Sequence, residues 1–277
     1  MSDKRGTVHL VVALMAEAKP LIRHFNLAPV ANAYPFNLYQ NDWLSLIVSG
    51  IGKLAAASAC GVLYQFTGAK KDHVWLNIGI SGAKNADLGS LWFASKVLDA
   101  SSGLTWYPQF TWPVEISRTT VTTVDHASTV EDSHTLYDME AAGFCAACSK
   151  FSSLELIHVL KIVSDNQDSS FTNLNKHVIE TLITNQLESI EASIFYLRKL
   201  VNQQQRLYQA PSLFADCLER WHFTITQRHQ LTELLRRWWL LCPNRPIWPE
   251  LAILPNAKTV IQTLFHKVEA AALTNVD

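Results

Sequence analysis

The sequence lacks the hallmarks of nucleic-acid-binding and membrane proteins. Its 23 Lys and Arg residues are balanced by 24 Asp and Glu residues, which leaves a net charge of −1. Proteins that neutralise many phosphate groups usually carry a clear basic excess, so we expect no nucleic-acid partner. No apolar run of about 18 residues occurs, and the apolar stretch 8–15 reaches Glu17 without a small-residue cleavage site. We therefore expect neither a membrane span nor an export signal.

Cysteine is scarce, and its count is odd. Five cysteines in a chain without an export signal indicate reduced thiols, so we expect a cytoplasmic protein. Cys145 and Cys148 form a C-x-x-C pair, but the small residues around them are typical of a buried helix face, with redox or metal use as the lesser alternative. No second cysteine pair or nearby histidine pair completes a zinc set, and we expect no metal and no cofactor.

The sequence contains neither a P-loop nor a complete dinucleotide-binding fingerprint. The turn Gly50-Ile51-Gly52 lacks the third glycine of that fingerprint. This turn and the turn Gly79–Gly82 each follow a predicted strand, where glycine is needed for steric reasons. Backbone N–H groups at such turns can also hold an anion or a polarised water molecule.

Strand and helix patterns alternate along most of the chain. The predicted strands span residues 7–14, 73–78, 90–98, 119–124 and 155–163, with a hairpin at 34–48. The predicted helices span residues 17–25, 54–66, 138–151 and 173–204. This alternation predicts an α/β fold in which helices flank a sheet dominated by parallel strands. Such sheets bind ligands at the C-terminal ends of their strands.

The chain changes character at about residue 206. Glycine is absent after Gly143, prolines divide the tail into short segments, and four of the nine tryptophans lie there. Apolar residues between 213 and 239 recur at spacings of three and four, which predicts one apolar stripe on each helix. We expect residues 1–205 to form one domain and residues 206–277 a Trp-rich helical extension that packs on this domain or on another subunit.

Polar groups follow several of the predicted strands. Glu17 and Ser164-Asp165 come directly after strands, and Asp138-Met139-Glu140 opens a predicted helix. Taken singly, each carboxylate could cap a helix or a turn. Together with the two glycine turns, they mark the end of the sheet where a ligand site is expected.

These segments, taken in order, resemble the nucleoside phosphorylase superfamily. The matching motifs are V-A-L-M-A-E at 12–17, S-G-I-G-K at 49–53, N-x-G-x-x-G at 77–82, D-M-E-A-A at 138–142 and S-D-x-x-D at 164–168. The sequence is most similar to the methylthioadenosine/S-adenosylhomocysteine nucleosidases, over about residues 7–200. The resemblance implies a three-layer, mixed and mostly parallel sheet flanked by helices, in a homodimer that acts on a small nucleoside.

The resemblance also implies a role for each matching residue. Asp165 matches the acid that protonates the purine leaving group, and Glu17 matches the carboxylate that positions or activates the attacking water. Glu140 matches the residue that binds the ribose hydroxyls, with Met139 packing against the sugar. Other matching positions would line the sugar and water site: Ile51, Gly79, Ser81, Gly82 and Ser164.

The chemistry of N-glycosidic cleavage fits this division of roles. The reaction builds positive charge on the ribose and negative charge on the leaving base. A carboxylic acid can protonate that base near neutrality only if burial raises its pKa from about 3.9. A base or water-orienting carboxylate must stand on the opposite side of the sugar.

The identity of the nucleophile follows from missing arginines. Phosphorylases of this superfamily carry arginines in the first glycine turn and beside the second, to hold phosphate. The corresponding segments 13–18 and 77–82 contain none here, so we expect water as the nucleophile. A phosphate-dependent phosphorylase with an unrecognised phosphate site is the alternative.

The residue that contacts the base departs from the family pattern. Ala127 stands where the nucleosidases place the aromatic that stacks on adenine, so Phe110, Trp112 or His126 would have to replace it. The segment 99–118 is also much shorter than in the family. These departures leave a further alternative open, namely a catalytically reduced module that binds a nucleoside or a protein partner.

Overall fold

The computed structural model describes residues 7–31, 35–68, 72–109, 116–126, 135–167, 174–208 and 211–274. Four residues of the motifs and their alternatives lie outside these stretches: Phe110, Trp112, Ala127 and Asp168. The chain divides into two compact units, residues 1–204 and 205–277. None of the helices within the described stretches is long and apolar enough to cross a membrane.

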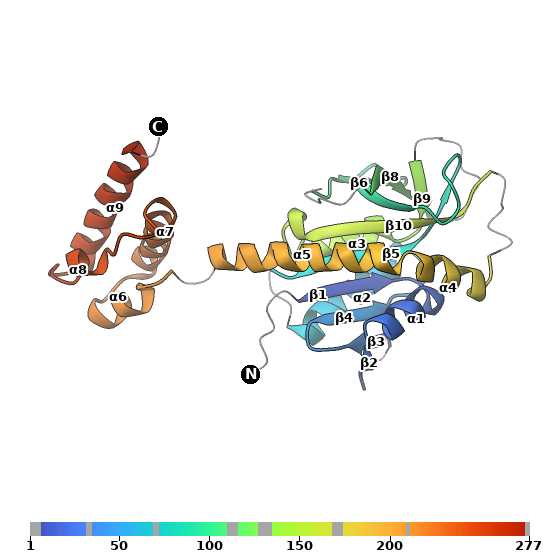
Figure 1. The fold of residues 1–277 in the computed structure, drawn as a ribbon, viewed down its shortest axis with the longest axis horizontal. Helices are drawn as coiled ribbons and strands as arrows, with labels where there is room; N and C mark the ends of the chain where they lie inside the picture. The colour runs from blue at the N-terminus through green and yellow to red at the C-terminus, as the bar shows by residue number, and fades with distance from the viewer. Residues whose placement is uncertain are drawn as a thin grey trace. The chain divides into compact units, whose positions relative to one another are not determined.

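The first unit is built on a mixed β-sheet (Figure 1). Its strands are β1 Val8–Val12, β2 Ala28–Pro29, β3 Asn37–Gln40, β4 Leu44–Val48, β5 Val74–Ala83, β6 Leu91–Asp99, β7 Thr105–Trp106, β8 Ser117–Thr123, β9 Thr135–Asp138 and β10 Ile157–Asp165. Parallel pairing joins β1 to β4 and β5, β5 to β10, and β8 to β6 and β9. The other pairings that the described residues form are antiparallel.

The long strand β5 links two parts of this sheet. Its first residues pair with β1, and β4, β3 and β2 continue from there. Its last residues, Gly82 and Ala83, pair with β9. Because β10 pairs with both β5 and β6, the strands β5, β9, β8, β6 and β10 form a closed ring. The predicted mixed α/β architecture is confirmed, whereas this closure was not predicted.

Helices cover both faces of the sheet. They are α1 Met15–His24, α2 Lys53–Thr67, α3 Ala141–Cys148, α4 Lys176–Asn185 and α5 Leu187–Tyr208, with a short 3₁₀ helix, η1, at Leu154–Leu156. In β1, Val11 packs with α2 and α3, while Leu10 and Val12 pack with α1, α4 and α5. Successive strand side chains point to opposite faces. Both faces of β1 are buried, which is why four of its five residues are apolar; the fifth, His9, is buried as well.

Two predicted helices differ from those observed. The helix predicted from Asp138 begins at Ala141, because Asp138 ends β9 and its side chain accepts a hydrogen bond from the Ala141 N–H. The helix predicted over 173–204 is two helices that meet at Gln186. The Gln186 side chain donates a hydrogen bond to the Gly89 carbonyl, and this contact fixes the break.

Helices α2 and α3 cross closely because of a glycine. A Cβ atom at Gly143 would lie 2.1 Å from the Lys53 carbonyl oxygen. This contact holds the N-terminus of α2 against α3. The C-x-x-C pair lies on α3 as predicted: Cys145 and Cys148 are buried free thiols, and the Cys148 Sγ lies 3.6 Å from the Cys60 Sγ.

The second unit has its own apolar core. Its helices are α6 Phe214–Arg220, α7 Ile225–Leu241, α8 Trp248–Leu251 and α9 Ala257–Thr274. Leu231, Leu234 and Trp238 form the predicted stripe on α7 and pack against residues of α8 and α9. Trp239 does not share in this core, since its side chain is 45% exposed.

Candidate active site

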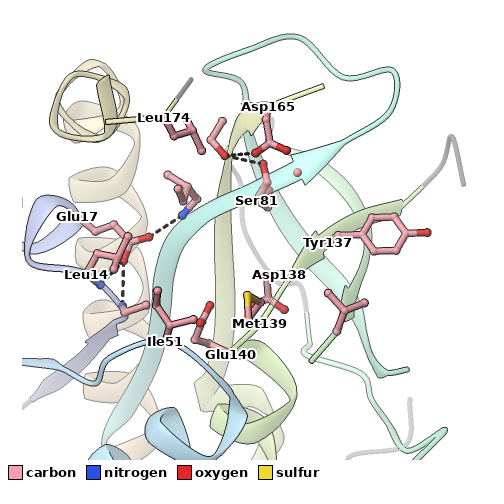
Figure 2. A pocket seen from close by; sticks show the side chains of 15 residues that line it. Leu14, Glu17, Ile51, Ser81, Tyr137, Asp138, Met139, Glu140, Asp165 and Leu174 are labelled. Carbon is pink, nitrogen blue, oxygen red and sulfur yellow. Dashed lines mark hydrogen bonds between the residues drawn. The ribbon is translucent and has the colours of Figure 1, made fainter. Parts of the chain in front are cut away.

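A cavity of about 260 Å³ opens at the ends of several strands of the first unit (Figure 2). Its lining residues are Ala13, Leu14, Glu17, Ile51, Ile80, Ser81, Gly82, Val124, Tyr137, Asp138, Met139, Glu140, Ser164, Asp165 and Leu174. They follow β1, β4 and β8 or end β5, β9 and β10. Ligand sites of α/β sheets lie at such C-terminal strand ends. Of the predicted site residues, only Gly79 is absent from this lining.

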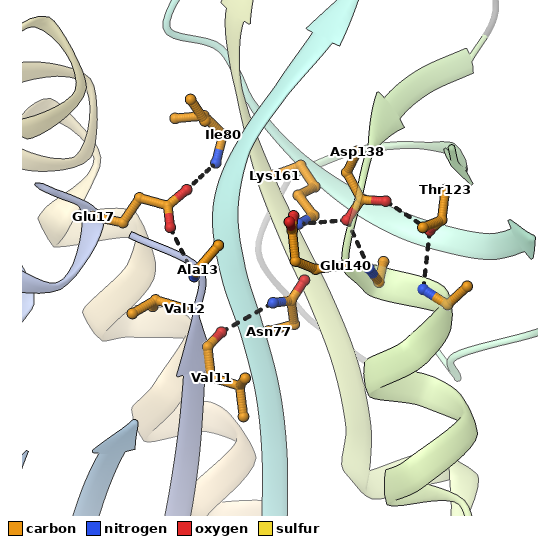
Figure 3. A network of polar contacts seen from close by, with 12 residues as sticks. Val11, Val12, Ala13, Glu17, Asn77, Ile80, Thr123, Asp138, Glu140 and Lys161 are labelled. Carbon is orange, nitrogen blue, oxygen red and sulfur yellow. Dashed lines mark hydrogen bonds and ion pairs between the residues drawn. The ribbon is translucent and has the colours of Figure 1, made fainter. Parts of the chain in front are cut away.

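Glu17 is held rigidly at one side of the cavity (Figures 2 and 3). Its Oε2 accepts hydrogen bonds from the backbone N–H groups of Ala13 (2.9 Å) and Leu14 (2.8 Å). Its Oε1 accepts one from the Ile80 N–H (2.9 Å). The side chain is only 2% exposed, and this burial raises its pKa although the backbone hydrogen bonds act to lower it. Raising the pKa of a fixed carboxylate improves it as a proton acceptor.

Gly79 lies against Glu17 and beside Lys161. A Cβ atom at this position would come within 2.9 Å of the Glu17 Oε1 and within 3.4 Å of the Lys161 Nζ. The absence of a side chain therefore lets both charged groups approach the backbone of β5. From the sequence, glycine was expected here because of the turn alone. The structure adds a steric reason, the close approach of Glu17 and Lys161.

Lys161 is a buried cation that pairs with the cavity-lining residue Asp138, and it was not among the predicted site residues. It is 1% exposed on β10, and its Nζ lies 2.8 Å from the Asp138 Oδ2 (Figure 3). Burial alone would lower the pKa of Lys161, but the carboxylates of Asp138 and Glu140 outweigh this effect and raise it. The sequence signal was a lysine within a largely apolar strand, since a buried charge requires a partner.

Asp138 joins Lys161 to the start of α3. Its Oδ1 accepts a hydrogen bond from the Thr123 hydroxyl (2.6 Å), and its Oδ2 accepts one from the Ala141 N–H (2.8 Å). The Thr123 hydroxyl oxygen in turn accepts a hydrogen bond from the Ala142 N–H. These contacts lock the end of β9 to the end of β8, and so fix the backbone that leads into Glu140.

Glu140 lines the cavity between the turn Gly50–Gly52 and Asp138. Its Oε1 accepts a hydrogen bond from the Gly52 N–H (2.8 Å), so the turn and the carboxylate hold each other. Burial raises the pKa of Glu140 to about 7, and the negative charge of Asp138 adds to this effect while Lys161 opposes it. A carboxylate with this pKa changes its charge near neutral pH.

Asp165 ends β10 on another side of the cavity from Glu17 (Figure 2). The Ser164 hydroxyl lies 2.6 Å from the Asp165 Oδ1 and 3.2 Å from the Ser81 carbonyl oxygen. An irregularity in the pairing of β10 with β5 between Val163 and Asp165 accompanies this arrangement. The Ser81 hydroxyl is buried in the cavity wall without a hydrogen-bond partner.

The wall beside the first glycine turn is stabilised by an ion-pair cluster. The Lys53 Nζ lies 2.7 Å from the Asp99 Oδ1 and 2.8 Å from the Asp125 Oδ1. Burial would raise the pKa of Asp99, but Lys53 and two serine hydroxyls lower it to about 2. Val124 lines the cavity next to this cluster, whereas His126 is exposed and is not part of the lining.

The polar lining is dominated by carboxyl groups. Within the described part of the chain, no arginine or lysine lines the cavity, since Lys161 lies behind Asp138. The described residues also contain no group of three or more His, Cys, Asp and Glu side chains that could hold a metal ion. The arrangement provides fixed proton donors and acceptors on different sides of one small space.

The fold is shared with known nucleosidases. A 5′-methylthioadenosine nucleosidase from Arabidopsis thaliana, in its apo form, matches with a TM-score of 0.56 and 18% identity, over 71% of this chain and 96% of that chain. A 5′-methylthioadenosine/S-adenosylhomocysteine nucleosidase from Neisseria meningitidis, in complex with methylthio-immucillin-A, matches with a TM-score of 0.54 and 18% identity, over 68% and 99% of the respective chains. Futalosine hydrolase from Helicobacter pylori matches with a TM-score of 0.54 and 13% identity, over 69% and 96%.

Comparison of sequences alone gives no relative. No family model matches the chain, and no curated protein matches it. The structural matches nevertheless confirm, at low sequence identity, the resemblance that the five motifs indicated. The matched structures are covered almost to their full length, while about 70% of this chain takes part.

Proposed function

We propose that the first unit is a nucleosidase that hydrolyses the N-glycosidic bond of a purine nucleoside, with water as the nucleophile. The observation that carries the proposal is the convergence of Glu17, Glu140 and Asp165 on one cavity from three separate segments of the chain. The shared fold of nucleosidases for methylthioadenosine-type substrates supports this choice of reaction and of substrate class.

Asp165 is the general acid of the proposed reaction. The leaving purine gains negative charge as the glycosidic bond breaks, and a proton delivered to a ring nitrogen neutralises that charge. The Ser164 hydroxyl, 2.6 Å from the Asp165 Oδ1, fixes the orientation of the carboxyl group. With the base at Asp165, the sugar extends toward the side of the cavity where Glu17 and Glu140 lie.

Glu17 activates the water molecule in this scheme. Three backbone N–H groups fix both of its oxygens, and burial raises its pKa, so it accepts a proton more readily than an exposed carboxylate. The oxygen nearest to Gly79 also faces the neighbourhood of the Lys161 ammonium group. Water that attacks the anomeric carbon transfers a proton to Glu17 as the new C–O bond forms.

Glu140 binds the ribose hydroxyls. Its Oε1 is occupied by the Gly52 N–H, which leaves the other oxygen to accept hydrogen bonds from the sugar. Its negative charge also stabilises the positive charge that develops on the ribose in the transition state. Met139, from the same segment, supplies an apolar surface against the sugar ring.

Water is favoured over phosphate by the charge of the cavity. Four carboxyl groups and no cation are found among the described lining residues, and a phosphate dianion would be repelled there. The products are then the free base and the free sugar. A phosphorylase would instead give a sugar 1-phosphate.

A panel of purine nucleosides, incubated with the purified protein with and without phosphate, tests the proposal. We expect free base from methylthioadenosine-type substrates at a rate that does not depend on phosphate. Chromatography of the base and mass analysis of the sugar distinguish hydrolysis from phosphorolysis. A phosphate-dependent rate with a ribose 1-phosphate product would assign the phosphorylase reaction instead, and no free base from any nucleoside would favour a binding module.

A further inference from the structure

We infer that the cavity selects nucleosides by charge: it accepts substrates with a positively charged group at the 5′ position in preference to neutral ones, and it accepts neutral ones in preference to anionic ones. The inference rests on the proposed function, because that function places the ribose among the carboxylates. It adds a property of the substrate that neither the reaction type nor the fold specifies.

The first support is the imbalance of charge around the cavity. Glu17, Asp138, Glu140 and Asp165 all line it. Of these four side chains, only Asp138 forms an ion pair with a described residue, namely Lys161. One ammonium group thus stands against four carboxyl groups: Lys161 pairs with Asp138, and its charge also acts to lower the pKa of Glu17 and of Glu140.

The second positive charge near the site, on Lys53, is also paired with carboxylates. Lys53 stands at the start of α2, next to the turn Gly50–Gly52. Its Nζ forms ion pairs with Asp99 and Asp125 and donates a hydrogen bond to the Ser101 hydroxyl oxygen (2.7 Å). It does not line the cavity. No positively charged side chain of the described lining is thus available to hold an anion.

The third support is a polar group that points to a ligand. The Ser81 hydroxyl lies in the cavity wall, its residue is 3% exposed, and it has no hydrogen-bond partner. A buried hydroxyl without a partner costs free energy unless a ligand satisfies it. The cavity is therefore equipped to hold a polar ligand at the same place where its charge is unbalanced.

The size of the cavity makes this selection effective. A 5′ substituent begins one bond away from the ribose ring, so its charge lies within about one Debye length, ~8 Å, of the surrounding carboxylates. In a half-buried site of intermediate dielectric constant, one unpaired charge at such a distance changes affinity by roughly tenfold. The pKa of Glu140, raised to about 7, reduces the effect near neutral pH without reversing its sign.

Matched substrates isolate the charge from the shape. Adenosine-5′-carboxamide and adenosine-5′-carboxylate are nearly isosteric and differ by one negative charge. The pair 5′-amino-5′-deoxyadenosine and adenosine differs by one positive charge. We expect kcat/KM for the carboxylate to be at least about tenfold below that of the carboxamide, and kcat/KM for the amine to exceed that of adenosine about threefold or more. The same four 5′ substituents are also tested with hypoxanthine in place of adenine, so that the comparison does not depend on the base.

A substitution at the cavity edge tests the cause of the selection. Ile51 lines the cavity and is 58% exposed, so a longer side chain fits there. Ile51→Lys should raise the ratio of carboxylate to carboxamide kcat/KM by about fivefold or more, and Ile51→Gln should leave it within about twofold. Because each ratio is taken within one variant, a general loss of activity does not affect it. High salt, about 1 M, should shrink the ratios in the wild type.

Binding separates this inference from the proposed function. Calorimetric titration of the same four compounds gives their affinities even without turnover. Hydrolysis of the carboxylate and the carboxamide with equal kcat/KM would overturn the charge selection and leave the nucleosidase intact. Charge-dependent binding without release of base would support the selection and remove the nucleosidase. Neither binding nor hydrolysis of any compound would overturn both.

Discussion

Asp165 is the side chain whose substitution tests the proposed chemistry most directly. Asp165→Asn keeps the shape of the group and its contact with the Ser164 hydroxyl, but it removes the transferable proton. General acid catalysis contributes about 10²–10⁴-fold, so we expect kcat to fall by that factor with KM nearly unchanged. Steady-state release of base provides the measurement.

The matched control is Asp42→Asn. Asp42 is exposed in the turn between β3 and β4, beside the start of β1 and so at the opposite end of that strand from the cavity. It should keep full turnover. If Asp165→Asn retained more than about half of the wild-type kcat, Asp165 would have no part in the proton transfer.

Glu140 makes the stability of the protein depend on pH. Burial raises its pKa from 4.5 to about 7 in the folded state. Between these values the folded state keeps a proton that the unfolded state has lost, so this group's contribution to stability falls as pH rises from 4.5 to 7. The loss is complete above the folded pKa and amounts to about 3 kcal/mol.

Glu140→Gln removes this titration and keeps an oxygen for the Gly52 N–H. The free energy of unfolding, measured in urea at pH 5 and pH 8, should therefore shift in favour of the variant at pH 8, by about 2 kcal/mol relative to wild type. Glu188→Gln, at an exposed position of α5, controls for the loss of a carboxylate. Equal differences between Glu140→Gln and wild type at the two pH values would contradict the prediction.

The strand β5 passes so close to two charged groups that only glycine fits at one of its positions. In Gly79→Ala, the new Cβ would meet the Glu17 Oε1 at 2.9 Å and the Lys161 Nζ at 3.4 Å. Glu17 would have to move away from the Ile80 N–H, which now holds it. A displacement of about 1 Å costs roughly 10²-fold in rate when it affects a positioned catalytic group. We expect a loss of this size in kcat.

Gly61 offers a matched comparison on α2. A Cβ at Gly61 meets nothing within 4 Å, and alanine is the better helix former by about 1 kcal/mol. Gly61→Ala should keep wild-type activity and raise the melting temperature slightly. Full activity of Gly79→Ala would show that the position of Glu17 is not critical.

The helices and strands were predictable wherever the local pattern determined them. Val8–Val12 is buried on both faces and reads as a strand, and the small residues of α3 read as a buried helix. The strand β9 was not predicted, because its four residues pair with β5 and β8, which are distant in sequence. The break between α4 and α5 depends in the same way on Gly89.

The candidate site was predictable in outline for a different reason. Parallel strands place their ends at one edge of a sheet, so Glu17 and Asp165 could be brought together without knowledge of the packing. The partners of these groups could not be read from the sequence. That Lys161 pairs with Asp138, and that Gly79 makes room for Glu17, depends on side chains from separate strands meeting in three dimensions.

The two units of the chain differ in how their apolar surface is buried. The second unit packs the stripe of α7 against α8 and α9. Several large apolar side chains of that unit nevertheless stay exposed, among them Ile225 (77%), Leu240 (56%), Ile253 (81%) and Phe265 (48%). Burial of such a side chain contributes about 1.5–3 kcal/mol. We therefore keep the prediction that this extension docks on the nucleosidase-like unit or on another subunit.

Comparison of the full-length protein with a truncation after Gln205 tests this prediction. If the extension docks, its removal exposes the apolar surface that it covered. The shortened protein should therefore aggregate or melt several degrees lower, since each kcal/mol corresponds to about 2–4 °C at this size. Light scattering and a melting curve provide the measurements. The full-length variant Phe265→Gln, changed on the exposed surface of α9, should show a smaller shift in the same direction. A truncated protein of equal stability, solubility and oligomeric state would show that the extension is an independent module, because no surface of the first unit would then depend on it.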